Sequence, residues 1–147
     1  MKTYYLNFNG FWLQSNLNTL PNQSGIYAIY RCVYNVRTNR VDIKALLYIG
    51  QAQDVNDRIS KHEKTPEFQK ELQYGEQICL AFAPLSLSDL DRVENALICT
   101  QKPPLNKVLT DSFNHPSTTV EVSGHYDLFT PGTWKTNDGR EIIIVTR

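Results

Sequence analysis

Several features that would point to a specialised class of protein are missing from this chain of 147 residues. Its 15 basic and 15 acidic residues leave no formal net charge, whereas many nucleic-acid-binding proteins are plainly basic. No apolar run approaches the roughly 20 residues of a membrane-spanning helix. Residues 1–5 also lack the apolar stretch of a secretory signal peptide. We therefore expect a cytoplasmic protein that makes no contact with a membrane.

Cysteine is scarce too, and the chain contains no repeat or low-complexity segment. Cys32, Cys79 and Cys99 are widely spaced and match no zinc-finger pattern, so we interpret them as small buried apolar side chains. Residues 31–70 hold eight Lys and Arg against five Asp and Glu. This excess predicts a modest basic face, although an ordinary solvated surface explains it equally well.

The length favours one domain built around one core. Three segments rich in Ile, Val and aromatic residues predict β-strands at residues 25–36, 41–49 and 77–85. A turn at 36–40 joins the first two into a hairpin. The third segment is more continuously apolar, which is typical of a central strand.

Three helices are predicted around these strands. The first spans residues 55–64 with Asp54 as its N-cap, and the second spans residues 67–74. The third is capped by Ser88 and ends before the two prolines at 103–104.

The two ends of the chain are less regular. We interpret the first twenty residues as an apolar segment that covers an edge of the core, and residues 110–119 as a loop. Residues 125–147 predict a hairpin with its turn at 137–139, which either adds strands to the core or forms a small appendage.

Polar residues in these segments carry the functional groups of metal-assisted phosphodiester hydrolysis. That reaction needs an activated water, positive charge on the phosphate and stabilisation of the leaving oxygen. Glu94 is the candidate metal ligand, because Mg²⁺ is often held by one or two carboxylates with waters and phosphate oxygens. A glutamate within a helix is usually a solvated surface residue, but the neighbours of Glu94 include the inward apolar residues of its helix.

Arg58 and His62 are one turn apart on the first predicted helix and so share a face. Arg58 either donates two N–H groups to a phosphate or pairs with Asp54 on the surface. His62 can accept a proton near neutral pH. Tyr27 and Tyr48 are core aromatics unless cations or an imidazole lie beside them, because tyrosine has an ordinary pKa of about 10.

Taken together, the order of these residues resembles the GIY-YIG nuclease superfamily. Gly25-Ile26-Tyr27 and Tyr48-Ile49-Gly50 are followed by Arg58 with His62, by Glu94 and by Pro104-Leu105-Asn106. The resemblance covers about residues 25–107. It implies an α+β fold, with a small three-stranded antiparallel sheet flanked by helices, and a site for one divalent metal. That metal would be Mg²⁺, with Mn²⁺ as a substitute.

The resemblance also implies roles for the site residues. Glu94 would bind the metal, Tyr27 would act as general base toward water, and His62 would relay or accept the proton. The arginine would stabilise the phosphoryl charge, with Tyr48 and Asn106 positioning groups around it. The residues alone leave a second reading of Asn106 open, which is a turn after the two prolines.

The chain departs from the family pattern in two places. The linker between the tripeptides is longer than is common, so its tip is an insertion. We expect Arg37 and Arg40 at this tip, together with Lys61, to contact nucleic acid. The region after Asn106 matches no part of the pattern, so we expect a nuclease domain at 1–107 and a C-terminal extension at 108–147 packed on the same domain.

The leading hypothesis is a magnesium-dependent endonuclease that hydrolyses DNA. A catalytically inactive nucleic-acid-binding module on the same fold is the alternative, and the zero net charge favours it. A nuclease that needs a protein partner for targeting is a third reading. Because one metal site cuts one strand, a homodimer formed through residues 125–147 is also a hypothesis.

Overall fold

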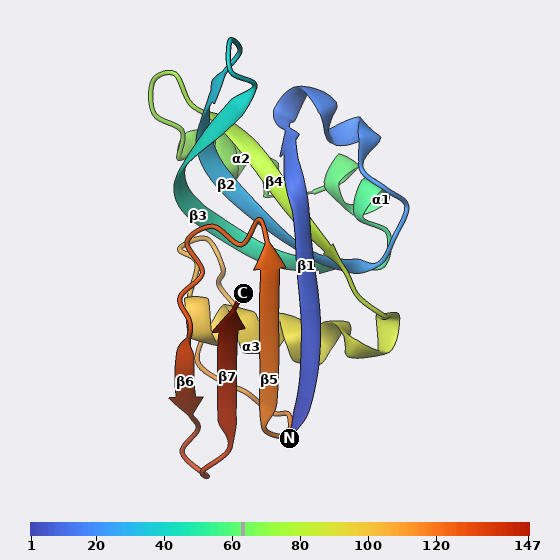
Figure 1. Cartoon of the computed structure of the whole chain (residues 1–147), viewed down its shortest axis with the longest axis vertical. Coiled ribbons are helices and arrows are strands. Elements are labelled where there is room, and N and C mark those ends of the chain that lie inside the picture. Colours follow the sequence, from blue (N-terminus) through green and yellow to red (C-terminus); the bar gives the residue numbers. More distant parts are fainter. Residues whose placement is uncertain (63) are drawn as a thin grey trace.

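The computed structural model describes residues 1–62 and 64–147, and Figure 1 shows the course of the chain. The strands are β1 (Lys2–Leu13), β2 (Gly25–Asn35), β3 (Arg40–Ala52), β4 (Gln77–Pro84), β5 (Thr118–Gly124), β6 (Gly132–Lys135) and β7 (Glu141–Thr146). The helices are α1 (Val55–Ser60), α2 (Thr65–Lys70) and α3 (Leu90–Gln101), with 3-10 turns η1 (Gln14–Thr19) and η2 (Leu87–Asp89).

The strands form one mixed sheet of seven, in the order β3-β2-β4-β1-β5-β7-β6. The predicted small three-stranded sheet flanked by helices is therefore wrong. The three predicted strands exist as β2, β3 and β4 and pair antiparallel, but the sheet continues through β1 into the C-terminal strands.

The long strand β1 is what extends the sheet. Its residues 2–8 pair parallel with β5, and Asn9, Trp12 and Leu13 pair antiparallel with β4, with an irregular register between Asn9 and Trp12. The expected covering segment is thus a central strand. Its Tyr4, Leu6 and Phe8 are buried while the residues between them are exposed, which is the alternation of a sheet with one covered face.

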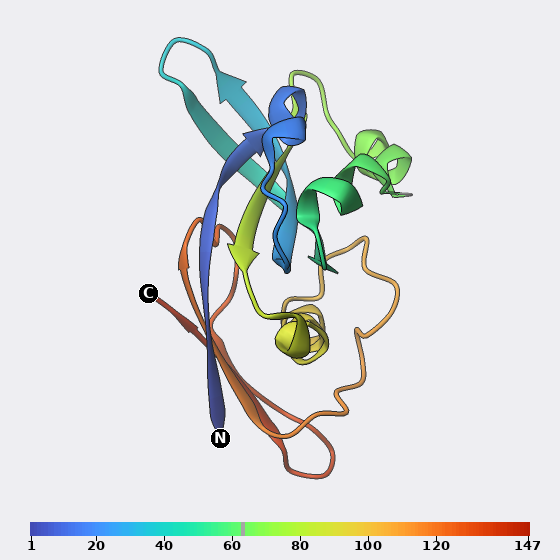
Figure 2. The same ribbon diagram turned by 90° about the vertical axis from the view of Figure 1, so that its right-hand side faces the viewer.

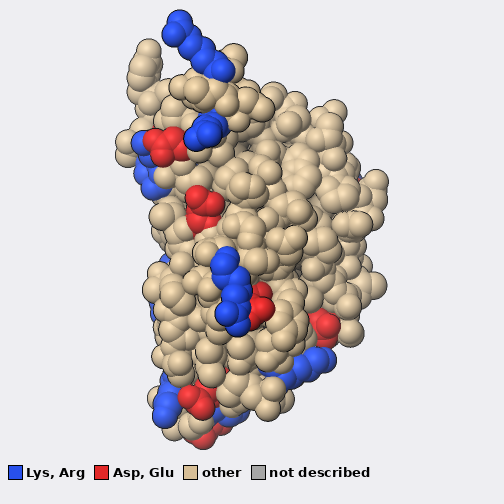
Figure 3. Space-filling view, viewed as in Figure 1, with Lys and Arg blue, Asp and Glu red and all other residues tan. Residues whose placement is uncertain are grey.

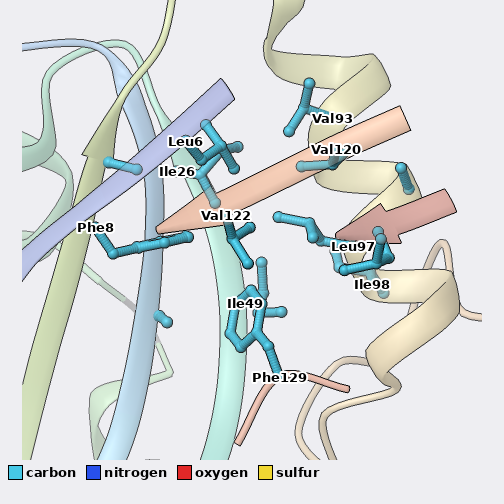
Figure 4. Packing of buried hydrophobic residues seen from close by; sticks show 14 of the residues in the cluster. Leu6, Phe8, Ile26, Ile49, Val93, Leu97, Ile98, Val120, Val122 and Phe129 are labelled. Carbon is cyan, nitrogen blue, oxygen red and sulfur yellow. The ribbon is translucent and has the colours of Figure 1, made fainter. Parts of the chain in front are cut away.

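The sheet curls around α3, as the two orthogonal views show (Figures 1 and 2). Val93, Leu97 and Ile98 of α3 pack in one cluster with Val120 and Val122 of β5 (Figure 4). The same cluster includes side chains from β1, β2, β3 and β7. A second cluster on the other face of β2 and β4 contains Val55 of α1 and Phe68 of α2, so β2 is covered on both faces.

The helices differ from their predicted bounds at several points. Asp54 caps α1 by accepting from the Asp57 N–H at 3.1 Å, as expected, but α1 ends at Ser60. Residue 63 of the predicted helix lies outside the described residues. Helix α3 begins at Leu90 after the 3-10 turn η2, so Ser88 is not its cap, and it stops at Lys102, where φ is +47°.

Three further expectations concern the cysteines, the C-terminal hairpin and membrane-spanning helices. Cys32 and Cys79 are buried, as expected, whereas Cys99 is partly exposed. Residues 132–146 form the predicted β6–β7 hairpin, which adds to the sheet. Within the described parts of the chain, no helix has the length and apolar character needed to cross a membrane.

The central position of β1 predicts a contrast between two neighbouring residues. Leu6 is 1% exposed in the core, whereas Tyr5 is 68% exposed on the opposite face of the strand. Leu6→Ala should lower the free energy of unfolding by about 2–5 kcal/mol, and Tyr5→Ala by no more than about 0.5 kcal/mol, in urea denaturation. Similar small losses for both variants would show that β1 is not a core strand.

Candidate active site

The two tyrosines of the tripeptides lie on one face of the β2–β3 hairpin. Tyr27 is opposite Gly50 and Tyr48 is opposite Ile29, so the two rings are diagonal neighbours with centroids 6.3 Å apart. A Cβ at Gly50 would lie 2.4 Å from the Tyr27 hydroxyl oxygen. The glycine is therefore needed because the Tyr27 phenol occupies the space where a side chain would stand.

His62 fixes the Tyr27 hydroxyl from the other side. Its Nε2 lies 2.8 Å from that oxygen, and the side chain is 6% exposed. The backbone N–H of Lys64 donates to Nδ1 at 3.1 Å. Because Nδ1 accepts, a neutral His62 carries its proton on Nε2 and donates it to Tyr27. This geometry favours donation by His62, whereas the family resemblance implies that His62 relays or accepts the proton of Tyr27.

The electrostatics of Tyr27 are dominated by its burial, which raises the pKa of the phenol above its ordinary range. The neighbouring Tyr48 also raises the pKa, whereas Arg58 lowers it through its charge and a hydrogen bond. Arg58 acts on the pKa of Glu94 as well, where it is again a lowering influence. The guanidinium of α1 thus acts electrostatically on both the phenol and the carboxylate.

Glu94 reaches this site from α3 and is only partly exposed. Burial raises the pKa of its carboxyl, and hydrogen bonds from Gln51 oppose that shift. The Gln51 Nε2 donates to Glu94 Oε1 at 2.9 Å and to Asp91 Oδ1 at 2.7 Å. Gln51 was not among the predicted site residues. The sequence feature that could have identified it is its position directly after Gly50.

The side chain of Asn106 hydrogen-bonds the backbone of β3. Its Oδ1 accepts from the Ile49 N–H at 3.0 Å, and its Nδ2 donates to the Ile49 carbonyl at 2.9 Å. The adjacent Leu105 N–H donates to the Leu47 carbonyl at 3.0 Å. The segment therefore pairs with the outer edge of β3, and Asn106 holds the strand of Tyr48 in place.

The three predicted nucleic-acid contacts lie outside this cluster. Arg37 and Arg40 are exposed at the tip of the β2–β3 hairpin, which projects beyond the sheet. Basic side chains stand out at this tip, whereas few charged residues lie over the visible face of β1, β5 and β7 (Figure 3). Lys61 is exposed and forms an ion pair with Asp57 at 3.0 Å.

The side chains that could serve as ligands decide what kind of divalent-metal site this cluster could form. Residues 1–62 and 64–147 contain no group of three or more His, Cys, Asp or Glu side chains arranged to hold a metal ion. Glu94 offers one partly buried carboxylate, with Asp91 sharing the Gln51 amide beside it. This set fits a Mg²⁺ ion that takes its other ligands from water and phosphate, and it does not fit a closed cage of protein ligands.

No protein-family model, curated protein or solved structure matches the chain. The resemblance to GIY-YIG nucleases therefore stays a prediction that depends on the residues and on the geometry described above.

Because burial raises the pKa of Glu94, we expect Glu94→Gln to gain stability in a pH-dependent way. A raised pKa means that the folded protein holds this proton more tightly than the unfolded chain. Glu94 therefore lowers stability as the pH rises from the ordinary glutamate value through the raised one. Without metal, Glu94→Gln should be more stable than the wild type at pH 7, and this gain should vanish below the ordinary value.

Urea denaturation at both pH values measures this difference. The exposed Glu71→Gln is a suitable control, because it removes the same charge from a solvated position. A loss of stability at pH 7 in Glu94→Gln, with no change in the control, would contradict the cost assigned to the buried carboxylate.

Proposed function

We propose that the protein is a GIY-YIG-type endonuclease that hydrolyses DNA phosphodiester bonds with a single divalent metal, Mg²⁺ or Mn²⁺. The observation that carries the proposal is the convergence of Tyr27, Arg58, His62 and Glu94 from β2, α1, the segment after it and α3. The proposal rests on these residues, and not on the small three-stranded fold that the sequence had predicted.

Glu94 is the residue that would hold the metal, with Asp91 next to it. A bound divalent cation would neutralise phosphate charge and stabilise the leaving oxygen. The pKa of Glu94 is raised because the hydrogen bonds from Gln51 and the charge of Arg58 do not fully offset the cost of burying its carboxylate. A cation at this position would supply the missing opposite charge, which is a physical reason for keeping a carboxylate at a half-buried site.

Tyr27, once its hydroxyl proton has passed to solvent, is the residue that would accept a proton from the attacking water. Burial makes its phenolate unfavourable, so other groups must offset that cost. The His62 Nε2–H donates to the oxygen on which the negative charge would develop, and Arg58 lowers the pKa of the same phenol. In this proposal His62 would stabilise the phenolate by donating a hydrogen bond.

Arg58 would also bind the scissile phosphate, since a guanidinium can form two parallel hydrogen bonds with phosphate oxygens. Arg37 and Arg40 at the hairpin tip would extend the contact along the nucleic acid. A substitution that removes one of these phosphate contacts should reduce the slope of log K against log salt by about 0.9. The strand periodicity places the tip on the order of 25 Å from Tyr27, so these contacts would lie several nucleotides away.

A cleavage assay tests this proposal. Purified protein should nick plasmid DNA with Mg²⁺ or Mn²⁺, and Glu94→Gln and Tyr27→Phe should each reduce the rate at least about a hundredfold. Tyr34→Phe is a matched control, because Tyr34 is on the same strand but hydrogen-bonds Asn39 near the hairpin tip. Mg²⁺ at 100 times its Kd should also stabilise the wild type by about 2.7 kcal/mol, but not Glu94→Gln.

A wild type that is inert on duplex, single-stranded and branched DNA with both metals would overturn the enzymatic proposal. The second candidate, a non-catalytic or partner-activated DNA-binding module, is favoured by the zero net charge and by the burial that disfavours a Tyr27 phenolate. DNA binding that is equally strong in the wild type and Glu94→Gln, with no cleavage by either, would identify that module.

A further inference from the structure

A hollow lies at the C-terminal end of α3, away from Tyr27 and Glu94. It has a volume of about 520 Å³ and is bounded by α3, the loop after it and the β6–β7 hairpin. Glu94 and Lys102 are eight positions apart, which corresponds to about 12 Å along a helix axis. None of the six predicted catalytic residues borders this hollow. Its volume is within the range of about 300–1,000 Å³ that is typical of small-molecule sites.

An aromatic ring forms part of the wall. Trp134 of β6 is directly opposite Ile142 of β7, and both border the hollow. Trp134 is only partly buried, borders the hollow and packs against the main core, so its ring is anchored at the wall of the hollow. An anchored indole is a platform on which a planar ring can stack.

Three cationic residues border the same hollow as this ring. Lys102, Lys135 and Arg140 all border the hollow. The Lys102 ammonium pairs with Asp111, and the Arg140 Nε pairs with both oxygens of Asp138, at 2.9 and 3.0 Å.

One of the three cations, Lys135, has no carboxylate paired with it among the described residues, whereas the Arg140 charge is shared with Asp138. Lys135 is exposed and stands directly opposite Glu141 in the register of the hairpin. Arg140 also donates from Nη1 to the His115 carbonyl at 2.7 Å, which holds its guanidinium in a defined orientation. Lys135 and Arg140 therefore place positive charge on the same hairpin as Trp134.

We propose that this hollow binds a nucleotide, with the base stacked on Trp134 and the phosphate beside Lys135 and Arg140. The combination of an aromatic platform and nearby cations is the chemistry by which proteins hold unpaired nucleotides. The nucleotide is either free or part of a single strand, and both sources share this chemistry. The inference does not depend on the proposed catalysis, since no residue is common to the two sites.

Tryptophan fluorescence tests the inference, because the chain has 2 tryptophans. Trp12→Phe leaves Trp134 as the only tryptophan, and Glu94→Gln with EDTA prevents cleavage during the titration. In this double variant, a mononucleotide such as dTMP or a short oligothymidylate should quench the emission in a saturable way. Adding Lys135→Gln should raise the Kd about tenfold, a loss of about 1.4 kcal/mol. Lys107→Gln, an exposed charge outside the hollow, should leave the Kd unchanged.

Saturation by dTMP alone would assign the hollow to free nucleotides, and saturation only by the oligothymidylate would assign it to a nucleic-acid strand. The inference is overturned if neither ligand quenches the emission, or if Lys135→Gln and Lys107→Gln have the same effect. Lys135 is exposed, so its substitution tests binding without disturbing the core. Cleavage activity in the wild type has no bearing on this result, which separates the failure of either proposal from the other.

Discussion

The enclosure of α3 by the curled sheet is the constraint on which the candidate site depends. Strand β1 pairs with β4 at one end and with β5 at the other, so the sheet bends around the helix. Val93 and Leu97 are fully buried in that enclosure, which sets the rotation of α3 about its axis. Glu94 lies between them in sequence and is directed toward Gln51 at the end of β3. The extended sheet therefore positions the Glu94 carboxylate close enough to the buried Tyr27 phenol to raise the pKa of that phenol.

The site itself combines tight packing with groups that are costly to bury. Gly50 makes room for the Tyr27 hydroxyl, and His62 donates to it with a tautomer that the Lys64 backbone determines. The pKa values of Tyr27 and Glu94 are both raised by burial. At neutral pH the charged Glu94 carboxylate lowers stability in this way. Such groups are expected at functional sites, where their compensation comes from a ligand. A cation between the Glu94 carboxylate and a bound phosphate would offset this charge.

The sequence predicted the local elements better than the overall sheet. The β2–β3 hairpin and β4 have strong local patterns, and the approach of His62 to Tyr27 agrees with the family resemblance. The parallel pairing of β1 with β5 brings Lys2 opposite Thr118, which is 116 positions away in the sequence. A local sequence pattern does not predict such a long-range contact. The alternating Tyr4, Leu6 and Phe8 were a sign of a strand, but the partner was not identifiable. The direction of the His62 hydrogen bond depends on a backbone N–H, and so it also required the structure.

The most direct test of the central claim, that Glu94 and Tyr27 share one metal site, is a crystal of Tyr27→Phe soaked with Mn²⁺ and a short DNA duplex. An anomalous peak is expected at about 2.0–2.2 Å from a Glu94 carboxylate oxygen, with a DNA phosphate as a second ligand. The substituted ring at position 27 should remain beside His62 in the same crystal. DNA bound in the crystal with no peak at Glu94, or with manganese held only at other carboxylates, would contradict the claim.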